Sequence, residues 1–159
     1  MTATLASIAQ KKFWSKDVCV YVGTERGLAR ELGSTPVESL DLVDLLPSGE
    51  ELPADDEGRS QFLESRLDSF LQDRKKSLQG RCIVVIKNAA LLARYRTGLR
   101  PVYDWFGGDR TMVVLLLAPT LAFRLPLHVE RDVKCDCNAS TEYLASCLAN
   151  PRLLFRERQ

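Results

Sequence analysis

Three short stretches of this sequence consist almost entirely of apolar, β-favouring residues: 18–22, 82–86 and 111–117. A strand with no polar position is typical of a parallel sheet, because helices cover such a sheet on both faces. Segments with helical spacing of apolar residues separate these stretches, and the clearest of them runs from Arg59 to Leu78. The pattern predicts an α/β fold, a three-layer sandwich around a mainly parallel five-stranded sheet.

Shorter patterns predict the remaining strands. Apolar and acidic residues alternate from Val37 to Leu46, which predicts a second strand and its exit. Apolar and charged residues also alternate between 129 and 137, which indicates a strand with one face in water. We therefore expect that segment to be the fifth strand, at an edge of the sheet.

Two further helices are predicted from spacing and from helix breakers. Leu28 to Leu32 forms a brief helix that Gly33 ends, since glycine is common just beyond a helix. Residues 89–106 form a longer helical stretch that Gly98 and Pro101 break or bend. Both segments connect predicted strands, as the helices of an α/β fold do.

The two ends of the chain carry weaker patterns. Residues 1–16 are predicted to form a short helix or arm. The last helix is predicted at 141–148, with Asn138 or Ser140 able to cap its start. Residues 151–159 are predicted to be a polar tail.

Composition bounds the class of protein. The 159 residues suit one domain, 1–159, with a single core. A net charge of +1 and 45% apolar residues are ordinary for a soluble globular protein, and they exclude a disordered chain or one steered strongly to nucleic acid. The longest apolar run, Met112–Pro119, is too short to cross a bilayer, so no membrane contact is expected. Five cysteines lie mostly in apolar patterns, which favours a reducing cytoplasm and core packing over a metal site.

Two places have the outline of a nucleotide site without its working residues. The first strand opens into residues 23–27, Gly-Thr-Glu-Arg-Gly, but the lysine and the metal-binding Ser or Thr of a phosphate loop do not follow. Lys87 and Asn88 follow the third strand, where a hydrolase would place an acid that binds Mg²⁺. Because a lysine repels Mg²⁺, we expect no metal-dependent hydrolysis and assign no catalytic residue.

In the order of its elements, the stretch 18–148 resembles a degenerate P-loop NTPase of the AAA+/STAND kind. Within it, the stretch from residue 83 to 119 resembles the small P-loop protein of bacterial BREX phage-exclusion systems. The resemblance implies a phosphate loop at 23–27, a sensor position near Thr120 and a scaffold or regulatory role, since both signature motifs have decayed. The cofactor-binding candidates it implies are Gly23, Thr24, Arg26, Gly27 and Lys87.

Two groups of arginines are candidate contact surfaces. The first, interleaved with aromatic residues, comprises Arg94, Arg96, Arg100 and Arg110. Arg96 and Arg100 are four residues apart, so on one helix they would share a face that could hold DNA phosphates or an acidic partner. The alternative is a solvated face whose aromatic residues point inward. A second group, Arg152 and Arg156 with the apolar residues between them, lies near the C-terminus.

The sequence therefore predicts a non-catalytic assembly or regulatory subunit of a bacterial multiprotein complex in the cytoplasm, with anti-phage defence as the setting that the resemblance implies. Its partners would be other protein subunits or further copies of itself, with DNA reached through the complex. No cofactor is expected beyond weak binding of ATP or ADP. The alternatives are a nucleotide-binding switch or ATPase with a composite site between subunits, and a DNA-binding accessory module.

Overall fold

The computed structural model describes residues 4–12, 14, 17–45, 55–75, 82–105, 111–118, 122–124, 132–134 and 137–157. The strands are β1 (Val18–Val22), β2 (Val37–Asp41), β3 (Cys82–Lys87), β4 (Thr111–Leu117), β5 (Ala122–Arg124), β6 (Asp132–Lys134) and β7 (Leu154–Arg156). The α-helices are α1 (Leu5–Ala9), α2 (Glu25–Leu32), α3 (Asp56–Lys75), α4 (Ala90–Arg94), α5 (Arg100–Trp105) and α6 (Cys137–Cys147). A 3-10 helix, η1 (Leu42–Leu45), follows β2.

Five strands form one sheet in the order β2-β3-β4-β1-β7, and every neighbouring pair is parallel. The apolar strands β1, β3 and β4 lie inside this sheet, as their composition predicts. In the register, Val20 of β1 lies opposite Leu115 of β4, and Val84 of β3 opposite Val113. The prediction of an α/β fold around a mainly parallel sheet is therefore confirmed.

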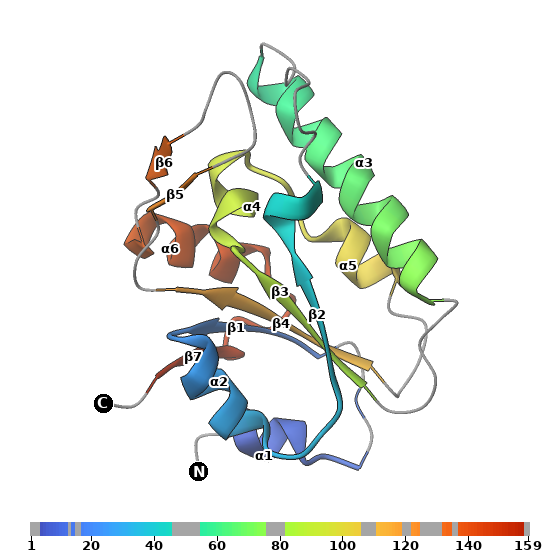
Figure 1. Ribbon diagram of the computed structural model, residues 1–159, viewed down its shortest axis with the longest axis vertical. Helices are drawn as coiled ribbons and strands as arrows, with labels where there is room; N and C mark the ends of the chain where they lie inside the picture. The colour runs from blue at the N-terminus through green and yellow to red at the C-terminus, as the bar shows by residue number, and fades with distance from the viewer. Residues whose placement is uncertain are drawn as a thin grey trace.

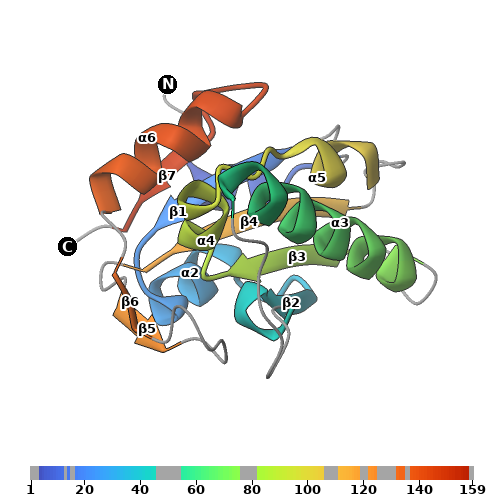
Figure 2. The same ribbon diagram turned by 90° about the horizontal axis from the view of Figure 1, so that it is seen from above.

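Helices cover both faces of the sheet, and Figure 1 shows α1 and α2 on one side with α3 to α6 on the other. Alternate side chains along each strand point to opposite faces of the sheet and pack against the two helix layers. Val18 and Val20 pack in the core beneath α3, α4 and α6, whereas Cys19 and Tyr21 pack in the core beneath α1 and α2. The view from above in Figure 2 shows α4, α5 and α6 stacked beside α3 over the same face. The result is a sandwich of helix, sheet and helix.

The predicted position of the fifth strand, between residues 129 and 137, is wrong. Within the segment 129–137 the structure describes β6, which pairs with β5 in a separate two-stranded antiparallel sheet. The fifth strand of the main sheet is β7, which comes from the predicted polar tail and pairs with β1. Leu153 is buried there, and Phe155 packs against the core under α1 and α2. These apolar contacts hold the segment on the sheet although most of residues 151–159 are polar.

The helical stretch predicted at 89–106 is two short helices, α4 and α5, separated by five residues from Tyr95 to Leu99. The chain turns where Arg96 adopts a left-handed backbone, at φ 49°. Pro101 does not break a helix; it lies in the first turn of α5, where its missing N–H costs nothing. The last helix starts earlier than predicted, so Asn138 and Ser140 lie inside α6 and do not cap it.

The N-terminal segment is part of the core. Trp14 is fully buried, and its indole N–H donates to the carbonyl oxygen of Ile8 at 2.9 Å. Leu5 and Ile8 on α1 are buried in the same cluster as α2. Within residues 1–16, predicted as a short helix or arm, Leu5–Ala9 form the helix α1, which closes one side of the sandwich.

No helix in the described ranges combines the length and the apolar character that crossing a membrane requires.

The fully buried thiol of Cys19, on the interior strand β1, leads us to expect a loss of stability at alkaline pH. Burial, aided by the Asp17 carboxylate and opposed by Lys11, raises the pKa of its thiol from 9.0 to about 12. Above pH 9 the unfolded chain loses a proton that the folded chain keeps, so stability present below pH 9 is lost as the pH rises toward 12. Between pH 8.5 and 10 we expect the free energy of unfolding of the wild type, measured in urea, to fall by about 1 kcal/mol more than that of Cys19→Ala. Equal losses would contradict this prediction.

Candidate functional site

The loop after β1 lies at the carboxyl ends of β1 and β4. These two strands are neighbours, but β1 continues into α2 on one face, while the chain after β4 leads to α6 on the other. Ligands of open α/β sheets bind where neighbouring connections diverge in this way. The amide of Gly23 donates to the carbonyl oxygen of Leu117 at 2.9 Å, which ties the loop after β1 to the end of β4. Residues 23–27 therefore lie where the sequence predicts a ligand loop.

Helix α2 begins directly after this loop, with Thr24 as its N-cap. The Thr24 hydroxyl accepts a hydrogen bond from the backbone N–H of Gly27 at 3.0 Å. A threonine cap satisfies one of the free N–H groups at a helix start, where the helix dipole also favours negative charge. The start of α2 is therefore suited to an anion.

The anion at this position is the side chain of Glu157, the residue directly after β7. Its backbone N–H donates to the carbonyl oxygen of Val22 at 2.9 Å, which extends the pairing of β7 with β1. Its carboxylate accepts from the Thr24 hydroxyl at 2.8 Å and from the Thr24 backbone N–H at 3.3 Å. The C-terminal segment thus supplies an internal carboxylate to the start of α2.

Gly23 and Gly27 are required by this contact. A Cβ on Gly27 would lie 2.5 Å from Cδ of Glu157, closer still to its Oε1, and 2.9 Å from the Tyr21 hydroxyl. A Cβ on Gly23 would lie 2.6 Å from Cβ of Glu157 and 2.8 Å from Cε1 of Tyr21. The two glycines that indicate a phosphate loop in the sequence are therefore accounted for by the packing of Glu157 and Tyr21.

Tyr21 borders the same contact and remains protonated across the physiological range. Burial raises the pKa of its phenol above 10.0, and the carboxylates of Glu157 and Glu31 raise it further against the opposing effect of Arg30. A neutral phenol beside the Glu157 carboxylate adds no second negative charge.

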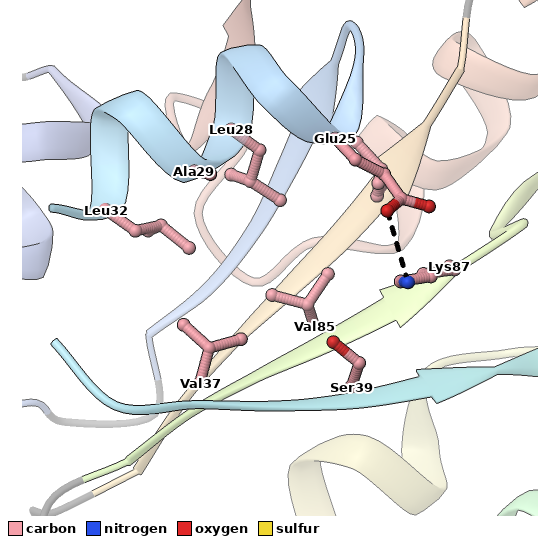
Figure 3. Close-up of a pocket in the computed structure, with 9 residues that line it drawn as sticks. Glu25, Leu28, Ala29, Leu32, Val37, Ser39, Val85 and Lys87 are labelled. Carbon is pink, nitrogen blue, oxygen red and sulfur yellow. Dashed lines mark ion pairs between the residues drawn. The ribbon is translucent and has the colours of Figure 1, made fainter. Parts of the chain in front are cut away.

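Lys87, at the end of β3, lies on the α2 side of the sheet and pairs with Glu25. The distance from its Nζ to Oε2 of Glu25 is 3.2 Å, and Figure 3 marks this pair at the end of a cavity. Asn88 follows with a left-handed backbone at φ 57°, and its amide donates to the carboxylate of Asp41 at 2.8 Å. Asparagine tolerates this conformation better than most residues. Lys87 and Asn88 are therefore both held by neighbouring side chains.

The five candidate cofactor residues separate into three settings. Gly23, Thr24 and Gly27 surround the Glu157 carboxylate, and Arg26 is exposed on the first turn of α2. Lys87 contacts the same helix through its ion pair with Glu25. Thr120, the implied sensor position, lies outside the described residues.

The first arginine group does not form one helix face. Arg94 ends α4, Arg96 lies in the turn that follows, and Arg100 begins α5. The guanidinium of Arg100 lies 3.4 Å from the carboxylate of Glu64 and 3.9 Å from that of Asp104. Arg110 lies outside the described residues. The shared face predicted for Arg96 and Arg100 is therefore wrong.

The second arginine group lies at strand β7, since Arg152 precedes the strand and Arg156 is its last residue. Arg152 and Arg156 are both exposed, while the apolar residues between them pack against the chain's own core. The terminal apolar residues thus dock on the domain itself, and the two arginines remain at its surface.

Among the described residues, no three or more His, Cys, Asp or Glu side chains gather closely enough to hold a metal ion. No family model matches the chain, and neither a curated protein nor a solved structure matches it significantly.

Proposed function

We propose that this chain is a non-catalytic assembly or regulatory subunit of a larger protein complex, with a P-loop NTPase-like fold kept for its surfaces. The sequence resemblance gives the proposal its setting, a bacterial phage-exclusion complex in the cytoplasm. Other protein subunits are its partners, and any contact with DNA comes through the complex.

The contact of Glu157 with Thr24 carries this proposal. In a nucleotide-binding loop the start of the helix holds a phosphate, and the glycines admit it. Here the Glu157 carboxylate takes the backbone N–H and hydroxyl of Thr24 and lies against both glycines. An internal acid replaces the phosphate, so the loop supports the fold without a ligand.

Electrostatics adds to the exclusion of a nucleotide. A phosphate at the start of α2 would lie within about 4 Å of the carboxylate, where two unit charges repel by about 4 kcal/mol at an effective dielectric constant of 20. A switch driven by ATP would have to displace Glu157 before it could bind.

An assembly that does not use nucleotide can be tested on the tagged chain purified from the cell that encodes it. We expect the chain to elute in a stable complex with other subunits, and the complex to persist after apyrase removes all ATP and ADP. Elution as a monomer would overturn the assembly role. Dissociation upon apyrase treatment would favour the nucleotide-dependent switch.

A further inference from the structure

A cavity of about 190 Å³ opens between α2 and the sheet, on the side away from α3 (Figure 3). Its volume equals that of about six water molecules, at roughly 30 Å³ each. Pockets for drug-sized ligands start at about 300 Å³. The space under α2 is smaller than such a pocket and suits a small organic group.

The walls of the cavity are apolar. Leu28, Ala29 and Leu32 line it from α2, and the sheet contributes Val37, Val85 and Leu116. Within the described part of the chain, Val37 is the most exposed large apolar side chain, at 43%. It lies on the edge strand β2, at the mouth of the cavity. Such walls favour a hydrocarbon group, because its transfer from water to an apolar wall is favourable.

One end of the cavity is polar, and its charged groups differ in exposure. The Lys87 side chain is 31% exposed, whereas that of its partner Glu25 is 65% exposed. Exposed ion pairs contribute little to stability, so Glu25 can turn into solvent at small cost. Figure 3 shows the Ser39 side chain pointing from β2 into the same space, where its hydroxyl can donate a hydrogen bond. Once Glu25 has turned away, the Lys87 ammonium remains at the end of an apolar cavity.

We propose that this cavity binds a small organic carboxylic acid with a short apolar tail. The ligand carboxylate pairs with Lys87 in place of Glu25 and accepts from the Ser39 hydroxyl, while its tail lies between α2 and Val37. Charge complementarity selects the carboxylate, and the volume of the cavity limits the tail to a few carbons. This site lies beyond the proposed assembly role and does not depend on it.

The first test is calorimetric titration of the full chain with butanoate, pentanoate, hexanoate and octanoate. We expect the affinity to rise about fourfold with each added methylene, the gain from burying one such group. The rise should stop near six carbons, because a methylene takes roughly the space of one water. An alcohol of the same length, hexanol, should bind about two- to fivefold more weakly than hexanoate, since it lacks the charge. No binding, or equal binding of acid and alcohol, would overturn the proposal.

Two variants are expected to act in opposite directions. Lys87→Met keeps most of the apolar stem and removes the charge, so hexanoate affinity should fall about two- to fivefold. Glu25→Gln removes the internal competitor, so affinity should rise about two- to fivefold. Glu31→Gln is the matched control on the same helix, outside the cavity lining, and should leave affinity unchanged.

Glu25 keeps the proposal testable if Lys87→Met fails to fold, because its exposed side chain tolerates substitution. An unchanged or weaker affinity in Glu25→Gln would overturn the proposal. A rise in Glu31→Gln as large as that in Glu25→Gln would also overturn it, since it would indicate a general charge effect on the whole surface.

Discussion

Replacing Trp14 with alanine is expected to lower the free energy of unfolding by about 3–5 kcal/mol, the usual cost of removing a buried aromatic side chain. The indole is fully buried and joins α1 to the core under α2. Its N–H also donates to the carbonyl oxygen of Ile8, which would lose that donor. Urea unfolding followed by circular dichroism measures the change.

Trp14→Phe is the matched control, because it keeps an aromatic ring and removes the indole donor. We expect it to cost about 1–2 kcal/mol, less than the alanine variant. A cost below about 1 kcal/mol for Trp14→Ala would mean that the N-terminal segment is a detachable arm and not part of the core.

Gly27→Ala is expected to lower the free energy of unfolding by about 2 kcal/mol, although alanine is the better helix former. The new Cβ would occupy the space of the Glu157 carboxylate and approach the Tyr21 hydroxyl. Glu157 must then give up its bonds to Thr24, each of them strengthened by charge. Thermal or urea unfolding of the variant measures the loss.

Gly98→Ala is the control for this substitution, because nothing lies within 4 Å of its ideal Cβ. It should be neutral or stabilise the fold by up to about 1 kcal/mol. A double-variant cycle separates the causes further. In a Glu157→Ala background the cost of Gly27→Ala should fall by more than half, because the two residues are coupled by contact. Additive costs would show that the carboxylate does not lie over Gly27.

The interior of the sheet could be predicted from sequence because its signal is local. The strands β1, β3 and β4 are buried on both faces, so nearly every residue in them had to be apolar. The helix α3 could be predicted for a similar reason, since one of its faces covers the sheet. The burial of these elements can therefore be inferred from their own residues.

The edges of the fold could not be predicted in the same way. β7 has only three residues, and it forms a strand because it pairs with the open edge of β1. The segment of β6 has the alternation of a strand, but alternation does not say which strand it pairs with. A partner is a tertiary property, which short patterns do not encode.

The candidate site shows the same limit. The loop at Gly23 and Gly27 was correctly placed at the end of β1, but its occupant lies 133 residues away from Thr24 in the chain. Nothing in the sequence near Glu157 distinguishes it from a surface acid. It became visible only when β7 brought the end of the chain beside β1.

Calorimetric titration of the wild-type chain with ATP and with ADP, each with and without Mg²⁺, tests the central claim most directly. If the Glu157 carboxylate fills the start of α2, the titrations should give no detectable heat at nucleotide concentrations up to about 1 mM, where binding would contribute only about 4 kcal/mol. Binding in the micromolar range, about 8 kcal/mol, would contradict the account. It would mean that a nucleotide displaces the internal acid, and that the loop at 23–27 still binds phosphate.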